Sequence, residues 1–222
     1  MQMPAKAKGY KGIGMEGPIA RWYAANTGKD LGVFTAEARK MAASLAPGAA
    51  VLEVAPGPGY FAIELARAGN FRITGLDISE TFVDIASQNA AAAGVAIELR
   101  RGDAAHMPFE DDTFDAIFCR AAFKNFSEPV PALREMYRVL KPGGRATIID
   151  LRKDVSKEAI DAEVASLKQS PLSAFVTKWT FRLMLTRRAY TRGEFVDFIR
   201  QTDFTKSDIE ETRTGFEISL VK

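Results

Sequence analysis

Apolar runs of strand length alternate along this chain with segments whose apolar residues recur at helical spacing. The pattern extends from about residue 49 to residue 151, and its short runs are rich in β-branched residues. Such alternation is typical of βαβ units, so it predicts an α/β fold with a doubly wound, mostly parallel sheet. The predicted strands lie in AAVLEVA, FRITGLDI, AIELRRGD, FDAIFCRA and RATIIDL, and the predicted helices in YFAIELARA, SETFVDIASQNAAAAG and EPVPALREMYRVL.

Local signals mark where several of these elements begin and end. Ser79 can accept a hydrogen bond from the free amides of the helix that it precedes, and Gly94 is placed to end that helix. The KPGG stretch at residues 141–144 is predicted to end the helix before the fifth strand. Two short alternating runs flank Gly215, which predicts an antiparallel hairpin at the end of the chain.

The chain has 222 residues, a length that one domain with a full core can use, so we expect a single domain. Within it we expect five parts. These are a mobile leader at 1–15, N-terminal helices at 16–48, a cofactor-binding core at 49–151, a helical lid insertion at 152–192, and a last helix with a hairpin at 193–222.

Composition narrows the classes of partner. The 30 basic and 28 acidic side chains leave a formal net charge of +2, which favours a small molecule over nucleic acid or an anionic membrane. A single cysteine, Cys119, rules out a disulfide framework and a thiolate zinc cluster, and it favours a reducing compartment. The basic N-terminal stretch has no apolar signal region, so we expect a cytoplasmic protein without bound metal.

A glycine-rich break interrupts VLEVAPGPGYFAIELA, residues 51–66, between a strand and a helix. Gly57 and Gly59 allow the backbone to approach a ligand closely, and the helix that starts near Tyr60 offers free amides to a negative group. Asp77 follows Gly57 by 20 residues, the spacing at which an acid accepts the ribose hydroxyls of adenosine. The break therefore predicts an adenosine-cofactor site; a turn glycine with a surface aspartate is the alternative.

The same residues are also compatible with a nicotinamide cofactor. GPGYFA fits the G-x-G-x-x-A form of the dinucleotide fingerprint, and Tyr137 and Lys141 form a Tyr-x-x-x-Lys pair. Lys141, however, stands at a helix end before Pro142, and Tyr137 falls among apolar positions, so we interpret both as packing and helix termination. An NAD(P)-dependent oxidoreductase and a non-catalytic cofactor-binding or partner protein stay as alternatives.

Four motifs in order, VLEVAPGPG, GLDIS, RGDAAHMPFEDDTFDAIFCRAAFKNF and REMYRVLKPGGRATIIDL, resemble the class I S-adenosylmethionine-dependent methyltransferases. The similarity is greatest to the branch that includes the ubiquinone/menaquinone methyltransferases. It covers about residues 49–151 and implies a seven-stranded, Rossmann-like sheet with an antiparallel last strand. It also implies transfer of a methyl group from S-adenosylmethionine to a small-molecule acceptor, with S-adenosylhomocysteine as product.

The resemblance implies a role for each matching residue in cofactor binding. The loop from Glu53 through Ala55 and Gly57 to Gly59 would lie against the methionine moiety, and Asp77 would accept from the ribose hydroxyls. Four further positions and one aromatic complete the implied set: Ile78 on the adenine, Asp103 and the Ala104 amide at the adenine amino group, the Cys119 backbone beside the sulfonium, and Tyr23 toward the methionine carboxylate.

Two departures from the family pattern bear on loop geometry and on substrate. Ala55 stands where the family has its first loop glycine, so we expect a loop backbone that avoids positive φ there. Lys124 and Asn125 stand where the quinone-type enzymes often carry two histidines. Lys124 is the candidate base if the acceptor must lose a proton, or else a lysine on the rim, and Arg120 is the candidate for charge stabilisation.

Acceptor specificity is expected in the segments that flank the cofactor core, residues 17–34 and 170–190. The second is both apolar and basic, which fits a lid over an apolar or anionic small molecule, a packed core helix, or a membrane-surface helix.

His106, the only histidine, falls in a loop expected on the cofactor side. The place after the fourth strand reads Cys-Arg-Ala-Ala, without the Pro-Pro-aromatic signature of enzymes that methylate nucleic-acid bases. The residues that suggested the lid are Phe175, Lys178, Trp179, Phe181, Arg182, Met184 and Arg187.

Overall fold

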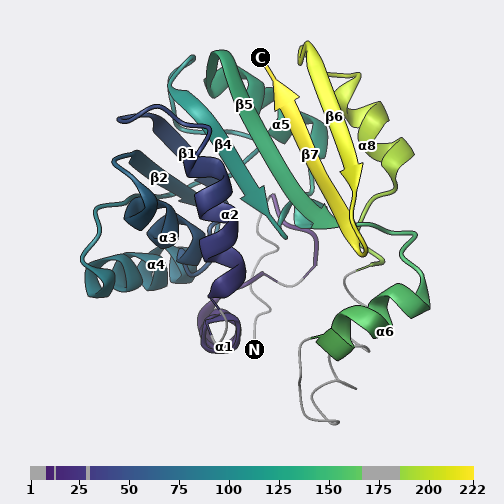
Figure 1. The fold of residues 1–222 in the computed structure, drawn as a ribbon, viewed down its shortest axis with the longest axis horizontal. Helices are drawn as coiled ribbons and strands as arrows, with labels where there is room; N and C mark the ends of the chain where they lie inside the picture. Colours follow the sequence, from purple (N-terminus) through teal and green to yellow (C-terminus); the bar gives the residue numbers. More distant parts are fainter. Residues whose placement is uncertain (1–8, 13, 29–30, 167–185) are drawn as a thin grey trace, which may run out of the picture.

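A seven-stranded sheet forms the centre of the computed structural model, which describes residues 9–12, 14–28, 31–166 and 186–222. The strand order is β3-β2-β1-β4-β5-β7-β6, and β7 is the only antiparallel strand among those described. The predicted mostly parallel, doubly wound sheet is thereby confirmed (Figure 1). The strands are β1 (Ala50–Val54), β2 (Arg72–Asp77), β3 (Glu98–Arg101), β4 (Phe114–Arg120), β5 (Leu140–Leu151), β6 (Lys206–Glu211) and β7 (Gly215–Val221).

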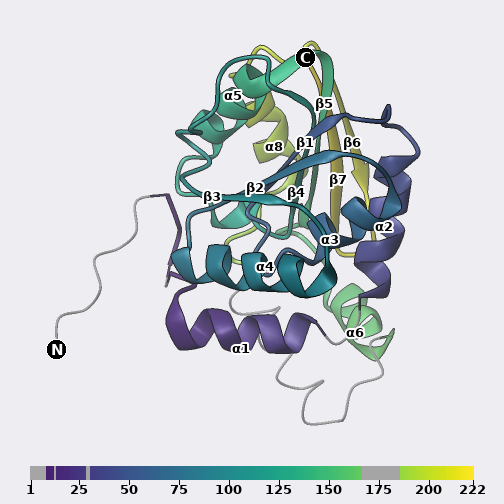
Figure 2. The same cartoon turned by 90° about the vertical axis from the view of Figure 1, so that its left-hand side faces the viewer.

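Helices cover both faces of this sheet and one of its ends. Helices α2, α3 and α4 lie on one face, and α5 and α8 lie on the other (Figures 1 and 2). Helices α1 and α6 lie beyond the edge where the parallel strands end. The bounds are α1 (Gly17–Thr27), α2 (Gly32–Ala42), α3 (Tyr60–Ala68), α4 (Glu80–Ala93), the short 3₁₀ helix η1 (Phe123–Asn125), α5 (Pro129–Val139), α6 (Lys157–Ser166) and α8 (Arg192–Ile199).

Alternation along the central strands divides the core between the two faces. Val51 packs with Phe61 and Phe118 toward α2 and α3, whereas Leu52 packs toward α5 and α8. The rings of Phe61 and Phe118 stack at 3.8 Å between centroids. Every residue of β1 is buried, as expected for a strand covered on both faces. This rigid centre holds the strand ends where the candidate site lies.

Helix boundaries follow the sequence signals closely, with one shift. The Ser79 hydroxyl accepts from the backbone N–H of Phe82 at 3.1 Å, and Gly94 ends α4 with a left-handed φ of 68°, so both predicted caps are confirmed. Helix α5, by contrast, ends at Val139, and residues 141–144 fall within β5. The register of β5 on β4 shifts in that stretch, which accommodates the glycines.

The hairpin predicted around Gly215 is also present. Strands β6 and β7 pair antiparallel along their length, and β7 inserts between β5 and β6 rather than at the sheet edge. The Gly215 position has no room for a side chain, because an added Cβ would lie 2.2 Å from the carbonyl oxygen of Asp150. The described residues contain no helix long and apolar enough to cross a membrane.

An N-terminal segment, residues 9–12, is docked onto the end of the sheet, and we call it the strap. The backbone N–H of Lys11 donates to the carbonyl of Asn125 at 2.7 Å, and Tyr10 forms an antiparallel bridge with Phe126. Further along, the carbonyl of Met15 accepts from the Ser79 hydroxyl at 2.6 Å. The mobile leader expected through residue 15 stays a prediction, while residues 9–12 and 14–15 make contacts of a kind that leaves no periodic pattern in the sequence.

Candidate functional site at the strand ends

The loop between β1 and α3 has an unusual backbone. Three of its residues have left-handed φ: Ala55 at 56°, Gly57 at 54° and Gly59 at 79°. The expectation that Ala55 would avoid positive φ is wrong. Its N–H donates to the carbonyl of Leu76 at 2.8 Å, and this link to β2 holds the alanine in a conformation that costs a non-glycine residue roughly 1–2 kcal/mol.

Asp77 ties this loop to the end of β2. One carboxylate oxygen accepts from the N–H of Gly57 at 3.0 Å, and the other accepts from the N–H of Ser79 at 2.9 Å. Asp77 is only 5% exposed. Since each carboxylate oxygen has a second acceptor site, the group can hold the loop and still accept from a ligand hydroxyl.

Glu53 is the second buried carboxyl at this point, and it lies at the end of β1. It is 4% exposed and accepts from the N–H of Ala62 at 3.1 Å. Burial raises its pKa from 4.5 to about 8, and burial likewise raises the pKa of Asp77 from 3.8 to about 6. Two carboxyls whose ionisation is disfavoured by burial favour a cation between them, because a cation would stabilise their charged forms.

Open space lies at Gly57, in the loop that follows Glu53 and is held by Asp77. A Cβ added at Gly57 would meet no atom within 4 Å, so the backbone there faces open space. Gly59, two residues further along the loop, approaches α4 so closely that an added Cβ would lie 3.0 Å from that of Ala86. The two glycines thus have separate purposes: one leaves room for a ligand and the other lets helix and loop pack. The loop fits the methionine moiety of S-adenosylmethionine, whose sulfonium and ammonium are cationic.

The residues expected at the adenine lie next along this edge. Ile78 follows Asp77 directly, and Asp103 lies at the turn after β3, where its Oδ1 accepts from the N–H of Ala105 at 3.0 Å. An added Cβ on Gly9 would lie 2.4 Å from Asp103 Oδ2, so the strap backbone contacts this carboxylate directly. Ala104 packs partly buried against the core. His106 is exposed beside Glu135, away from the loop at residues 55–59.

Tyr23 reaches the same region from α1. Its ring packs edge-on against Phe82 at 5.8 Å. Burial raises the pKa of the Tyr23 hydroxyl, as do the charges of Asp150 and Asp77, while Arg120 opposes them. Tyr23 is therefore close to charged groups at the ends of β2, β4 and β5, and its role toward the methionine carboxylate stays a prediction.

The end of β4 contributes Cys119 and Arg120. Cys119 is fully buried, and burial raises the pKa of its thiol well above the usual value, so the thiol stays protonated at neutral pH. Arg120 forms an ion pair with Glu37 of α2 at 2.9 Å and lies over the ring of Phe34 at 5.1 Å. Sequence reasoning missed Glu37, because nothing in the spacing connects it to residue 120.

Lys124 occupies a different environment from the expected rim. Its side chain is 3% exposed, and Nζ forms an ion pair with Asp150 at 2.8 Å while donating to the carbonyl of Ala121. The backbone N–H of Lys124 donates to the other Asp150 oxygen at 2.7 Å. The alternative interpretation of Lys124 as a lysine on the rim is therefore wrong. A general base is not supported either, since the free amine would leave the buried Asp150 carboxylate without its ion-pair partner.

Four further residues reach this edge that sequence analysis did not single out as site residues. Tyr10 and Lys11 come from the strap, and Arg188 and Tyr190 come from the segment before α8. The side chain of Lys11 donates to the Tyr190 hydroxyl, and Tyr10 is hydrogen-bonded to Arg188. The predicted lid at residues 170–190 lies outside the described residues up to residue 185, so that prediction stays open.

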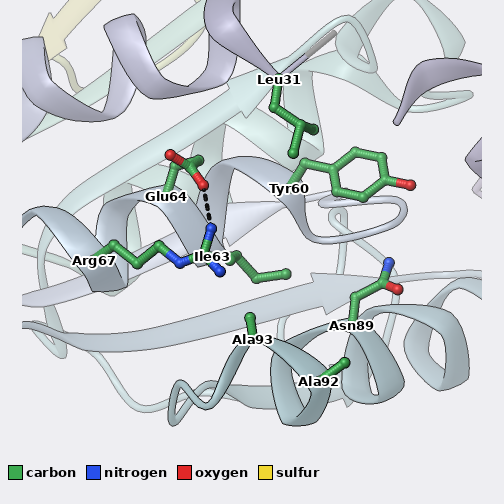
Figure 3. Close-up of a pocket in the computed structure, with 8 residues that line it drawn as sticks. All are labelled: Leu31, Tyr60, Ile63, Glu64, Arg67, Asn89, Ala92 and Ala93. Carbon is green, nitrogen blue, oxygen red and sulfur yellow. Dashed lines mark hydrogen bonds and ion pairs between the residues drawn. The ribbon is translucent and has the colours of Figure 1, made fainter. Parts of the chain in front are cut away.

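A separate cavity of about 260 Å³ lies between α3 and α4 (Figure 3). Its charged members are already paired, since Glu64 binds Arg67 at 2.8 Å and accepts from the Thr35 hydroxyl at 2.7 Å. The charged side chains that line this cavity are therefore engaged in pairs. The candidate site lies at the strand ends and not in this cavity. It is lined by Leu31, Tyr60, Ile63, Glu64, Arg67, Asn89, Ala92 and Ala93.

The pair that suggested a dehydrogenase, Tyr137 and Lys141, lies away from the glycine loop. Tyr137 packs edge-on against Phe204 at 5.2 Å, and Lys141 forms an ion pair with Asp115 at 2.8 Å. Both flank the start of β5, the opposite end of the sheet from Glu53 and Asp77. Their interpretation as packing and termination residues accords with these contacts.

Comparison with known proteins connects this site to one family. The methyltransferase domain family matches residues 52–148, the segment that carries the loop, Asp77, Asp103 and Cys119. A putative S-adenosylmethionine-dependent methyltransferase from Methanococcus maripaludis superposes with a TM-score of 0.75 at 22% identity, covering 96% of this chain and 95% of that one. The fold is that of the class I methyltransferases. The predicted resemblance to this class is confirmed.

Curated relatives agree over the same segment. The demethylmenaquinone methyltransferase of Deinococcus radiodurans is 44% identical over 101 residues, which are 45% of this chain and 42% of that protein. A ubiquinone/menaquinone biosynthesis C-methyltransferase of Geotalea daltonii is 38% identical over 109 residues, covering 47% and 46%. The chain thus matches less than half the length of these relatives. Over this segment the chain is similar to methyltransferases of the ubiquinone/menaquinone branch.

Proposed function

We propose that this protein transfers the methyl group of S-adenosylmethionine to a small-molecule acceptor. The observation that carries the proposal is the open space at Gly57 in a loop that connects two buried carboxyls, Glu53 and Asp77, within a segment that matches methyltransferases. A cationic ligand relieves the unfavourable ionisation of these carboxyls. A neutral or anionic ligand such as a dinucleotide pyrophosphate does not.

Each cofactor residue then has a defined task. S-Adenosylmethionine supplies an activated methyl group when bound. The Glu53 carboxyl and the loop backbone hold the methionine end, with Tyr23 toward its carboxylate. Asp77 accepts from the ribose hydroxyls on the sides of its oxygens that face away from Gly57 and Ser79. The remaining assignments are Ile78 on the adenine, Asp103 and the Ala104 amide at its amino group, and the Cys119 backbone beside the sulfur.

The acceptor follows from the relatives and from the site's chemistry. Relatives named for demethylmenaquinone and for ubiquinone/menaquinone support a quinone-type aromatic acceptor in its reduced, hydroxyl-bearing form. Arg120, at the end of β4, is placed to stabilise negative charge on it. Lys124 and Asp150 act as a buried pair that positions η1 and the end of β5.

The fold alone does not specify the reaction, since the [4+2]-cyclase SpnF has a TM-score of 0.63 to this chain at 19% identity. The decisive experiment is therefore a calorimetric titration with S-adenosylmethionine, S-adenosylhomocysteine, NAD and NADP in parallel, followed by transfer of labelled methyl to reduced naphthoquinones. We expect both sulfur cofactors to bind and neither nicotinamide cofactor to do so. Binding of NAD or NADP alone would overturn the proposal, and cofactor binding without methyl transfer would restrict it to binding.

A further inference from the structure

The strap is attached to the chain that follows β4. Tyr10 forms an antiparallel bridge with Phe126, the residue that comes directly after η1. Backbone hydrogen bonds flank this bridge on both sides, at 2.7 Å through the N–H of Lys11 and at 3.1 Å through the carbonyl of Gly9. These two bonds hold one end of the strap beside the end of β4.

The strap also lies against the acid expected at the adenine. A Cβ added at Gly9 would overlap Oδ2 of Asp103, so the strap backbone touches this carboxylate directly. Burial raises the pKa of the Tyr10 hydroxyl, Arg188 opposes that rise, and the charge of Asp77 adds to it. Tyr10 is therefore within electrostatic range of the acid expected at the ribose. The strap thus meets both acids that the proposed function assigns to the nucleoside.

Glu16 forms a second attachment, at the start of α4, and we call this attachment the latch. Its carboxylate accepts from the N–H of Glu80 at 3.0 Å, from the N–H of Thr81 at 3.1 Å and from the Thr81 hydroxyl at 2.6 Å. Beside it, the carbonyl of Met15 accepts from the Ser79 hydroxyl at 2.6 Å. The start of a helix has free N–H groups and a partial positive charge, and both favour a carboxylate in this place.

The latch is charged, and it adjoins α1. Burial acts to raise the pKa of Glu16, but hydrogen bonds from Thr81, Glu80 and Ser79 lower it below the usual value, so the carboxylate is ionised at neutral pH. Helix α1 begins directly after Glu16 and lies along α4 (Figure 2). The latch therefore holds the chain at the point where it passes from the strap into α1.

The two attachments lie on opposite sides of the nucleoside positions. The strap contacts the chain after β4 and, through Asp103, the turn after β3. The latch lies at the start of α4, which follows Asp77 at the end of β2. The chain that joins strap and latch therefore passes beyond the strand ends from one side of this site to the other. A ligand that contacts Asp77 and Asp103 together lies between this chain segment and the sheet.

From this path we infer that residues 9–12 and 14–16 form a cover over the nucleoside half of bound S-adenosylmethionine, with Glu16 as the positioning residue that latches it. The inference rests on the proposed function. Because the cover is attached on both sides of the site, it has to detach from one of them whenever the cofactor enters or its product leaves. The closed cover keeps water from the cofactor, and its opening sets the rate of exchange. The cover lies outside residues 52–148, the segment that matches the family.

A disulfide across the strap tests the cover. The flanking hydrogen bonds make Tyr10 and Phe126 a pair of the kind whose Cα atoms lie about 4.5 Å apart, which a disulfide can span. The single native cysteine, Cys119, is buried and does not compete. A Tyr10→Cys/Phe126→Cys variant is loaded with labelled S-adenosylhomocysteine, oxidised, and chased with unlabelled ligand. We expect release at least about tenfold slower than from the same protein after reduction, and equally slowed uptake by oxidised protein without ligand.

The latch is tested by a second variant that needs no cross-link. Glu16→Gln should speed both release and uptake of S-adenosylhomocysteine at least about threefold, because a neutral amide is held more weakly by the N–H groups of α4. Since the cover opens more often with and without ligand, the dissociation constant should change less than either rate. Glu80→Gln, the same change at an exposed position of the same helix end, should keep the native rates.

Each outcome decides the question. Equal release from the oxidised and the reduced protein, no disulfide in the protein without ligand, or native rates in Glu16→Gln would overturn the inference. Faster release without faster uptake in Glu16→Gln would show a damaged site and overturn it too, and this variant decides alone where the double variant does not fold. A disulfide that forms only without ligand and blocks binding would place the strap in the adenine position, against the inference. Failure of the native protein to bind S-adenosylhomocysteine would instead refute the proposed function.

Discussion

Asp77 accepts from the backbone N–H of Gly57 at 3.0 Å, so the acid that the sequence places at the ribose also holds the glycine loop in its shape. The second oxygen of the same carboxylate accepts from Ser79 at the start of α4. One side chain thus joins the loop, the end of β2 and a helix terminus. Loss of this group would remove the support of the loop and, on the proposed function, the contact with the ribose as well.

The first prediction concerns this carboxylate. Asp77→Asn should weaken S-adenosylhomocysteine binding by about 1–3 kcal/mol, because the amide places an N–H₂ group opposite a backbone N–H donor and loses charge-assisted bonds. Isothermal titration calorimetry measures the change. Asp84→Asn, an exposed position on α4, is the matched control and should bind as the native protein does. Native affinity in Asp77→Asn would remove Asp77 from the site.

The second prediction concerns the left-handed alanine. Ala55→Gly should raise the free energy of unfolding by about 0.5–1 kcal/mol, since relief of the strained φ exceeds the entropy that glycine loses on folding. Urea denaturation followed by circular dichroism measures it. Ala90→Gly, in the interior of α4, should lower stability by about 1 kcal/mol and serves as the opposite case. A loss of stability in Ala55→Gly would show that Ala55 is not strained.

The third prediction concerns pH. Because the pKa of Glu53 is about 8 when folded and 4.5 as its ordinary value, the folded chain keeps a proton that the unfolded chain releases between those values. Stability should therefore fall as pH rises through that window, and Asp77 should add a similar fall between 3.8 and about 6. Glu53→Gln should flatten the upper part of the curve and raise stability at pH 8 by about 1–3 kcal/mol.

Denaturation at pH 5, 6.5 and 8 tests the Glu53 effect, with the exposed Glu110→Gln as control. The same Glu53→Gln variant should bind S-adenosylmethionine less tightly, because the stabilising contact with a cation is lost. A native pH slope in Glu53→Gln would exclude Glu53 as the group responsible.

The fourth prediction concerns the buried pair of Lys124 and Asp150. Lys124→Met should lower the free energy of unfolding by about 3–5 kcal/mol, since it leaves a buried carboxylate without its partner. The double variant with Asp150→Leu should recover part of that loss. Turnover of the folded double variant should remain measurable and keep the native pH profile; loss of one limb of that profile would restore Lys124 as a base.

The sequence by itself determined the order and type of the elements and the resemblance of residues 52–148 to a methyltransferase domain. Strand and helix periods, the caps at Ser79 and Gly94, and the spacing of Gly57 and Asp77 are local signals, and local signals survive in a single chain. The last hairpin was also readable from Gly215. Only the predicted end of the helix before β5 differs from the structure. The KPGG stretch lies within β5, where the register of β5 on β4 shifts, rather than at the helix end.

The tertiary structure decided which side chains meet. Lys124 faces Asp150 across 26 residues, Arg120 faces Glu37 across 83, and Lys11 faces Tyr190 across 179. Such pairs have no period or spacing, because they arise only when separate elements pack. Even the φ of Ala55 belongs to this group, since a hydrogen bond to the next strand holds it against its own preference. Local signals therefore specified the glycine loop, and packing specified which charged side chains meet at the strand ends.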